Sequence, residues 1–153
     1  MSDVRAVSRA GATQPAHLAF LAARTMGHLV TLRADGRPHV SNVLYHLDAA
    51  AAIARISVTT DRLKVRNVRR DPRVVLHVDG DGGWTWLAAD AIAELSPVTT
   101  RPDDPTAEEL VALYRAIRGE EHPNWTEFRE AMVAEQRLVM RLQLTRTYGL
   151  PSR

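Results

Sequence analysis

Hydrophobic and polar positions along this chain follow a helical spacing near the start and an alternating spacing afterwards. In residues 16–25, Leu18, Leu21 and Ala22 lie on one face of a helix. From residue 28 onward, short runs rich in β-branched residues are separated by glycine, proline and aspartate, as is typical of strands joined by turns. These runs predict six strands, at residues 28–33, 38–47, 53–59, 73–78, 84–95 and 138–147.

Three later segments return to the helical spacing. Residues 62–70 predict a short helix with Asp61 as its N-cap, and an aspartate-proline pair ends it because proline disfavours helix at the residue before it. Residues 106–118 carry an apolar stripe and begin with Thr106 in a sequence that fits a capping box. Residues 124–135 predict the last helix.

The order of these elements predicts an α+β fold that is mainly β. The links between strands are as short as hairpin turns, which implies antiparallel pairing, since parallel strands need long crossovers. Six strands in a chain of 153 residues predict a small antiparallel barrel with helices packed outside it. We expect one domain at residues 16–153, preceded by a flexible N-terminal arm at residues 1–15.

Composition narrows the class of protein. Apolar residues make up 45% of the chain and charged residues 25%, as in ordinary globular domains, which argues against disorder. The chain has no cysteine, so disulfides, thiolate metal sites and a cysteine nucleophile are excluded. No apolar run is long enough to span a membrane and no signal peptide is visible, so we expect a cytoplasmic protein with no membrane partner.

The basic residues are almost all of one type: 19 are arginine, and Lys64 is the single lysine. The first turn of a helix has unpaired N–H groups and a partial positive charge that suit a phosphate. Arg62 and Lys64 fall in that turn, and Ser57 and Thr59 add hydroxyl groups from the end of the preceding strand. The segment therefore indicates either a phosphate site or a basic helix facing solvent, and Lys64 is either a compact ammonium that the site needs or a surface residue.

A second group of interest follows the glycine turn at residues 80–83. Trp84 and Trp86 are two positions apart and point to the same face of a strand, with Thr85 between them. This pattern indicates core or dimer packing, or else one wall of a site for a planar ligand.

Familiar catalytic patterns are absent from the sequence. The histidines show no metal-ligand spacing, so we expect no metal site. There is no nucleophile elbow, Walker loop or dinucleotide-binding glycine pattern. If the protein is an enzyme, its reactive group is therefore expected to come from a bound cofactor.

Several of these stretches, in this order, resemble one family. They are the Asp-Gly-Arg-Pro turn with the Val40–His46 strand, residues 62–73, the Gly-Gly-Trp segment, residues 113–119 and the final Tyr148-Gly-Leu-Pro151. Together they make the chain similar, from Leu21 to Pro151, to the split β-barrel, FMN-binding-like oxidoreductases of the pyridoxamine-phosphate oxidase superfamily. Within it, the chain looks most like the branch that uses coenzyme F420, a deazaflavin.

The resemblance implies a homodimer with two cofactor sites at the subunit interface. It implies that Arg62, Lys64 and Asn67 bind the cofactor phosphate together with Ser57. It also implies that Asn42 lies against the ring system. Trp84 and Thr85 would be contributed by the partner subunit.

The function implied is hydride transfer between the deazaflavin and a small conjugated organic substrate, with Tyr45 or His46 as the candidate proton donor. The chain ends in Tyr-Gly-Leu-Pro-Ser-Arg and lacks the Arg-Leu-Ala-Pro-like run of the vitamin B6 enzymes, which argues against vitamin B6 oxidation. Alternatives are an FMN-dependent oxidoreductase, a deazaflavin carrier without turnover, and an arginine-rich nucleic-acid-binding module. A net charge of only +2 argues against nucleic acid as a partner.

Overall fold

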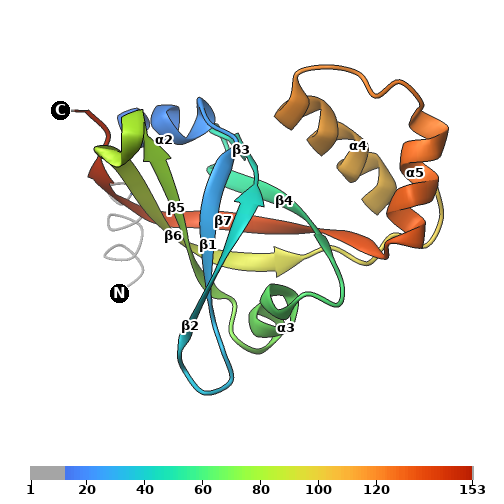
Figure 1. Cartoon of the computed structure of the whole chain (residues 1–153), viewed down its shortest axis with the longest axis horizontal. Helices are drawn as coiled ribbons and strands as arrows, with labels where there is room; N and C mark the ends of the chain where they lie inside the picture. Colours follow the sequence, from blue (N-terminus) through green and yellow to red (C-terminus); the bar gives the residue numbers. More distant parts are fainter. Residues whose placement is uncertain (1–12, 153) are drawn as a thin grey trace, which may run out of the picture.

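The computed structural model describes residues 13–152, which form one curled antiparallel sheet with α-helices around it (Figure 1). The fold is mainly β, as the hydropathy pattern predicts, and the segment 53–59 is a strand with the predicted bounds. The elements are α2 (Pro15–Ala22), β1 (Met26–Leu32), β2 (Pro38–Leu44), β3 (His46–Asp48), β4 (Ile53–Thr59), α3 (Leu63–Arg70), β5 (Arg73–Gly80), the 3-10 turn η1 (Asp81–Gly83), β6 (Thr85–Leu95), α4 (Pro105–Arg118), α5 (Trp125–Ala134) and β7 (Arg137–Leu150).

The described residues form seven strands, so the prediction of six is wrong by one. They are ordered β2-β1-β5-β6-β7-β4-β3 in a single sheet. The predicted strand at 38–47 is divided at Tyr45, whose side chain is fully buried. Its backbone N–H donates to the carbonyl of Thr25 at 2.8 Å, and its hydroxyl donates to the carbonyl of Leu21 at 2.6 Å. These two bonds hold the chain at the point where it leaves one edge of the sheet for the other.

The division at Tyr45 explains the shape of the sheet. Strands β2 and β3 lie at opposite edges of the sheet, yet only one residue separates them in sequence. The sheet must therefore curl until its two edges approach each other, and the result is a barrel that is open between β2 and β4 (Figure 1). An open barrel of this kind leaves room for side chains from both edges to line a common space.

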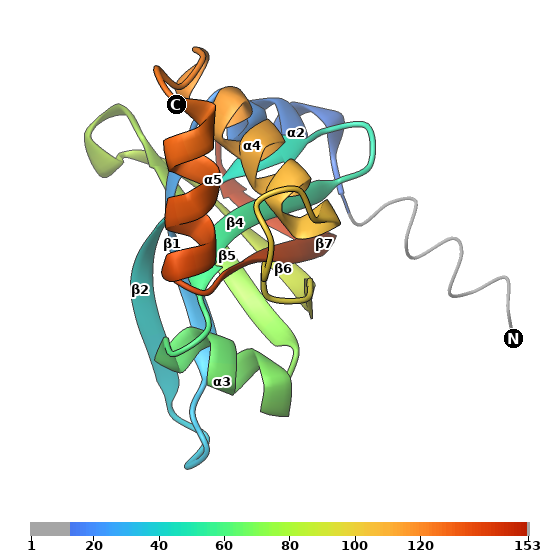
Figure 2. The same ribbon diagram turned by 90° about the vertical axis from the view of Figure 1, so that its right-hand side faces the viewer.

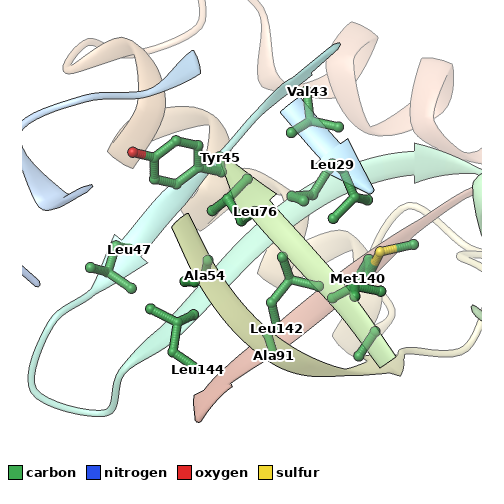
Figure 3. Packing of buried hydrophobic residues seen from close by; sticks show 14 of the residues in the cluster. Leu29, Val43, Tyr45, Leu47, Ala54, Leu76, Ala91, Met140, Leu142 and Leu144 are labelled. Atoms are coloured by element: carbon green, nitrogen blue, oxygen red, sulfur yellow. The ribbon is translucent and has the colours of Figure 1, made fainter. Parts of the chain in front are cut away.

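The hydrophobic core fills the inside of the curl (Figure 3). Burial alternates along the strands, as in Ile53–Thr59, because successive side chains point to opposite faces. The buried side chains shown in Figure 3 include Leu29, Val43, Leu47, Ala54, Leu76, Ala91, Met140, Leu142 and Leu144.

The outer face of the same sheet exposes large apolar side chains. Met26 is 64% exposed, Val40 60% and Ile92 45%. Met26 pairs directly with Leu44 across strands β1 and β2, and Leu44 is also exposed. Large apolar side chains exposed on one face of a sheet indicate an interaction surface. We call this set, completed by Tyr148 and Leu150 of β7, the outer apolar face.

The helices lie at two places around the barrel. Helices α4 and α5 lie together against one side, and α3 lies near the β1–β2 hairpin (Figures 1 and 2). Helix α4 begins one residue earlier than expected, because Asp104 is the N-cap and accepts a bond from the N–H of Ala107. The capping box proposed to begin at Thr106 is therefore wrong; the Thr106 hydroxyl donates to the carbonyl of Pro97.

At the N-terminus, helix α2 starts at Pro15. This residue therefore belongs to the helix and not to the arm expected at residues 1–15. The backbone N–H of Gln14 donates to Oγ1 of Thr147 at 3.3 Å. Residues 1–12 of the expected arm lie outside the described residues. Within residues 13–152, no helix has both the length and the apolar character that crossing a bilayer demands.

Candidate functional site

A cavity of about 260 Å³ opens where the two edges of the sheet approach each other. Strands β2 and β4 form its walls, and α3 and α4 close its ends. It brings together three of the predicted site residues, Asn42, Ser57 and Lys64, from three separate elements. Its remaining lining residues are Val43, Leu44, Ile56, Tyr114, Ile117, Arg118 and Arg137.

The start of helix α3 places Lys64 at the cavity. The helix begins at Leu63 with Arg62 as its N-cap, so the prediction of Asp61 as the cap is wrong by one position. The carboxylate of Asp61 instead accepts a bond from the hydroxyl of Thr59 at 2.8 Å. That bond lowers the pKa of Asp61, and the carboxylate stays charged just outside the helix. Lys64 is thus the second residue of the helix.

The ammonium group of Lys64 has no compensating charge in the described part of the chain. No carboxylate there forms a hydrogen bond or ion pair with it. Partial burial lowers the pKa of Lys64, and the positive charges of Arg62 and Arg137 lower it further. Each of these causes disfavours the charged form, and each would be offset by an anion placed in the cavity.

Arg137 completes the cationic lining and was missed by the sequence analysis. Its Nη1 donates to Oγ of Ser57 at 3.2 Å, and its Nε donates to Glu135 at 2.7 Å. Arg137 reaches this place because it pairs with Thr59 in the register between β7 and β4. The pairing joins residues far apart in the chain, so no local pattern points to it.

Arg118 comes from the last turn of α4. Its guanidinium lies 5.6 Å from the centre of the Tyr114 ring, a cation–π arrangement, and both residues line the cavity. Helix α4 is fixed against the sheet by Glu109, which accepts bonds from Arg55 at 3.2 Å and from Nε of Arg141 at 2.8 Å. Hydrogen bonds from Arg141 lower the pKa of Glu109, and the charges of both arginines add to the effect.

The other phosphate ligands expected at α3 are placed differently. The amide of Asn67 is fully buried; it donates to Oγ1 of Thr31 at 3.0 Å and accepts from Arg70 at 2.9 Å. The side chain therefore joins α3 to β1 and does not line the cavity. Thr59 and Arg62 are close in sequence to Ser57 and Lys64, but they do not line the cavity.

Trp84 and Thr85 lie away from this cavity. They follow η1 at the turn between β5 and β6, which Figure 1 shows at the upper left, away from α3 at the lower centre. Trp84 is 68% exposed, whereas Thr85 is buried and its hydroxyl has no hydrogen-bond partner within residues 13–152. Within one chain, Trp84 and Thr85 therefore do not lie beside Lys64. Their expected contribution from a partner subunit stays a prediction.

Neither candidate proton donor lines the cavity. Tyr45 points into the core, where burial raises the pKa of its hydroxyl well above the ordinary value. His46 lines a different and larger groove, of about 790 Å³, beside Glu109 and α4. The structure therefore leaves the proton donor unassigned.

Known proteins resemble this chain in family profile, in sequence and in fold. The family profile described as pyridoxamine 5'-phosphate oxidase matches residues 13–150. An F420H(2)-dependent biliverdin reductase from Mycobacterium tuberculosis is 39% identical over 80 residues. That match covers 52% of this chain and 56% of the reductase, so the chain spans little more than half the length of this relative.

Two solved structures show the same fold. One, described as an F420 reductase, superposes with a TM-score of 0.64 at 24% identity, over 86% of this chain and 95% of its own. The other is a conserved hypothetical protein from Mycobacterium tuberculosis, with a TM-score of 0.70 at 20% identity, over 90% and 84% of the two chains.

Proposed function

Since the chain belongs to the pyridoxamine 5'-phosphate oxidase family, we propose that it is an oxidoreductase that uses coenzyme F420 to reduce a small conjugated substrate. The name of the biliverdin reductase relative supports the choice of cofactor. The observation that carries the proposal is the cavity lined by Lys64, Arg118 and Arg137, in which Lys64 faces no carboxylate of the described residues.

The cavity fits an anion of the size of a phosphate diester. Its polar lining consists of cations, hydroxyls and one amide, and no acidic residue takes part in it. A charge-assisted hydrogen bond from an ammonium or guanidinium group to phosphate is about twice as strong as a neutral one. An anion there would also remove the electrostatic cost that lowers the pKa of Lys64.

The cavity is too small for the whole coenzyme. Its 260 Å³ fall below the roughly 300–1,000 Å³ of complete small-molecule pockets. The ring system would therefore extend beyond the cavity, and Asn42, which lines the cavity, would hold it. We infer a homodimer in which a second copy covers the outer apolar face and completes the site. The exposed Met26 and Val40 on that face support this arrangement.

Within this site each residue has a physical task. Lys64 and Arg137 neutralise the phosphate, and Ser57 is held by Arg137 with its oxygen toward the cavity. Asn42 orients the ring through its amide. The apolar side chains of Val43, Leu44 and Ile56 exclude water, which strengthens each of these polar contacts. When bound, the deazaflavin supplies the hydride, and the protein orients it toward the substrate.

FMN carries a phosphate as well, so the cavity alone does not separate the two cofactors. The test is a fluorescence titration of the purified protein with coenzyme F420 and, separately, with FMN. We expect saturable binding of coenzyme F420 that weakens by about 1.5–3 kcal/mol, roughly 10- to 150-fold, in Lys64→Ala. Arg101→Ala is the matched control, since Arg101 is an exposed cation paired with Asp103 outside the cavity.

The outcomes of this titration separate the alternatives. If the protein prefers FMN, the proposed cofactor changes to FMN and the proposed binding site stays the same. Equal affinity of the wild-type protein and Lys64→Ala would remove Lys64 from the site and overturn the proposal. A protein that binds coenzyme F420 but never oxidises the reduced form with any conjugated acceptor would be a carrier.

A further inference from the structure

A cluster of two histidines and one aspartate lies on the outside of the sheet, and none of the three residues lines the cavity. His28 in β1 pairs directly with His77 in β5, so their side chains emerge side by side on the outer face. Asp79 is two residues further along β5 and points to the same face. One ligand atom from each residue lies within 4.8 Å of the others, and residues 13–152 contain no other group of this kind.

Spacing along the chain predicts no metal site, because the two histidines are 49 positions apart. Only the register between β1 and β5 brings them together. The two rings have their centres 6.0 Å apart. The cluster is therefore a product of the fold that a search for sequence motifs does not detect.

Neighbouring side chains fix both imidazoles. Nδ1 of His28 lies 2.9 Å from Oδ1 of Asn42, and since that oxygen only accepts, Nδ1 carries the hydrogen. The ring of His77 stacks on Trp86, with ring centres 5.6 Å apart and an angle of 17° between the planes. Histidines that bind metals commonly donate a hydrogen bond from their second nitrogen to an oxygen, as His28 does to Asn42, and this bond sets the tautomer.

The hydrogen bond to Asn42 leaves Nε2 of His28 directed at Asp79, and this nitrogen lies 3.4 Å from Oδ2 of the carboxylate. When the ring is neutral with its hydrogen on Nδ1, Nε2 carries the lone pair that a metal ion needs. Nδ1 of His77 is 3.9 Å from Oδ1 of the same carboxylate, beyond hydrogen-bond distance. Ligand atoms of all three residues thus converge on one point, where a metal ion could accept an electron pair from each of them.

We propose that His28, His77 and Asp79 bind a divalent transition-metal ion, with Zn²⁺ as the best match. Two imidazoles and one carboxylate form a donor set that suits zinc. Zinc holds these donors at about 2.0–2.2 Å in a tetrahedron, which places neighbouring ligand atoms about 3.4 Å apart. The His28–Asp79 pair already has this separation.

Asn42 then acts as a positioning residue in this site. It touches no metal in the proposed arrangement and holds His28 in the tautomer that exposes Nε2. Loss of such a partner typically reduces metal affinity by about 10- to 100-fold. None of the three ligands lines the cavity, but Asn42 both lines the cavity and bonds to His28, so the metal site and the cofactor site would share this residue.

The test is metal binding to tag-free, full-length protein that has been stripped with a chelator. Calorimetry with Zn²⁺, and visible absorption with Co²⁺ as a spectroscopic probe, should both show one ion per chain. Asp79→Asn, which keeps the shape of the side chain, and His77→Gln should each abolish the binding. Asn42→Ala should weaken it by about 10- to 100-fold.

His122→Gln is the matched control, since His122 lies in an aromatic cluster with Tyr114 and Trp125, far along the chain from the proposed ligands. This variant should bind metal as the wild-type protein does. Circular dichroism establishes which variants are folded. The comparison needs only one of the two variants, Asp79→Asn or His77→Gln, to be folded. The proposal is overturned if the wild-type protein binds no ion, or if a folded Asp79→Asn or His77→Gln variant binds as tightly as the wild type.

Discussion

Arg137 at the start of β7 donates a hydrogen bond to Ser57 in β4 across 3.2 Å. The bond crosses the pair of strands that forms one wall of the cavity, and it links a hydroxyl that the sequence analysis selected to a cation that it missed. The two residues act as a unit, because the guanidinium determines where the hydroxyl points.

Arg137→Gln should therefore weaken the binding of coenzyme F420 more than Ser57→Ala does. The arginine change removes both a positive charge and the group that orients Ser57, and we expect a loss of about 1.5 kcal/mol, roughly tenfold. Ser57→Ala leaves both cations in place and should cost less. The measurement is the same fluorescence titration, with Arg101→Ala as control. A larger loss in Ser57→Ala than in Arg137→Gln would contradict this order of effects.

Lys64 offers a direct measure of the charge in the cavity, because it is the single lysine of the chain. Reductive methylation with ¹³C-formaldehyde labels Lys64 and the N-terminal amine, and NMR follows the titration of each. Burial and the arginines lower the pKa of Lys64 in the free protein. Addition of cofactor should raise this pKa, since a phosphate favours the ammonium form. A pKa that stays the same while the cofactor is bound would place the phosphate elsewhere.

Tyr45→Phe should destabilise the fold without changing cofactor affinity. The change removes the hydrogen bond to the carbonyl of Leu21, which keeps the N–H of Arg24 as a donor, so we expect a loss of about 0.5–1.5 kcal/mol in the free energy of unfolding. Denaturant titration measures this loss. Unaltered binding of coenzyme F420 would agree with the position of the ring in the core, and a loss of binding in a folded variant would return Tyr45 to the site.

The same residue predicts how stability depends on pH. Burial raises the pKa of Tyr45 in the folded state above the ordinary value near 10. The unfolded chain therefore releases the proton first as pH rises, so this contribution to stability is complete below about pH 10 and is lost above it. Denaturant titrations between about pH 8 and pH 11 should show the decline in the wild-type protein and a smaller decline in Tyr45→Phe.

The outer apolar face predicts the oligomeric state. Light scattering coupled to gel filtration should give twice the 17.0 kDa of one chain. Val40→Glu and Ile92→Glu each place a charge on this face at an exposed position, so they should yield folded monomers. Ala50→Glu, at an exposed turn between β3 and β4, should remain dimeric. A wild-type protein of 17.0 kDa in solution would refute the dimer.

The sequence predicts the strands well wherever alternation decides them. The bounds of 53–59 are reproduced, since its alternate residues are buried against the core. The break at Tyr45 is missed because the residues on both sides continue one alternating pattern. Only the burial of the Tyr45 ring beside α2 shows that the chain changes edges there.

The candidate site is predicted in part for a similar reason. Lys64 stands out by composition and Ser57 by its place at a strand end, and both line the cavity. Asn67 is one helical turn away from Lys64, and a helical projection alone does not reveal which of its sides faces the barrel. Arg137 and the His28–His77 pair depend on strand register between distant segments, which local patterns do not contain.

The one-residue link at Tyr45 also limits how the mouth of the cavity can move. Strand β2 forms one wall of the cavity. Tyr45, which follows β2, is anchored by two hydrogen bonds before the chain enters β3. Because β3 pairs with β4 on the other side of the cavity, this single residue ties the positions of the two walls to each other.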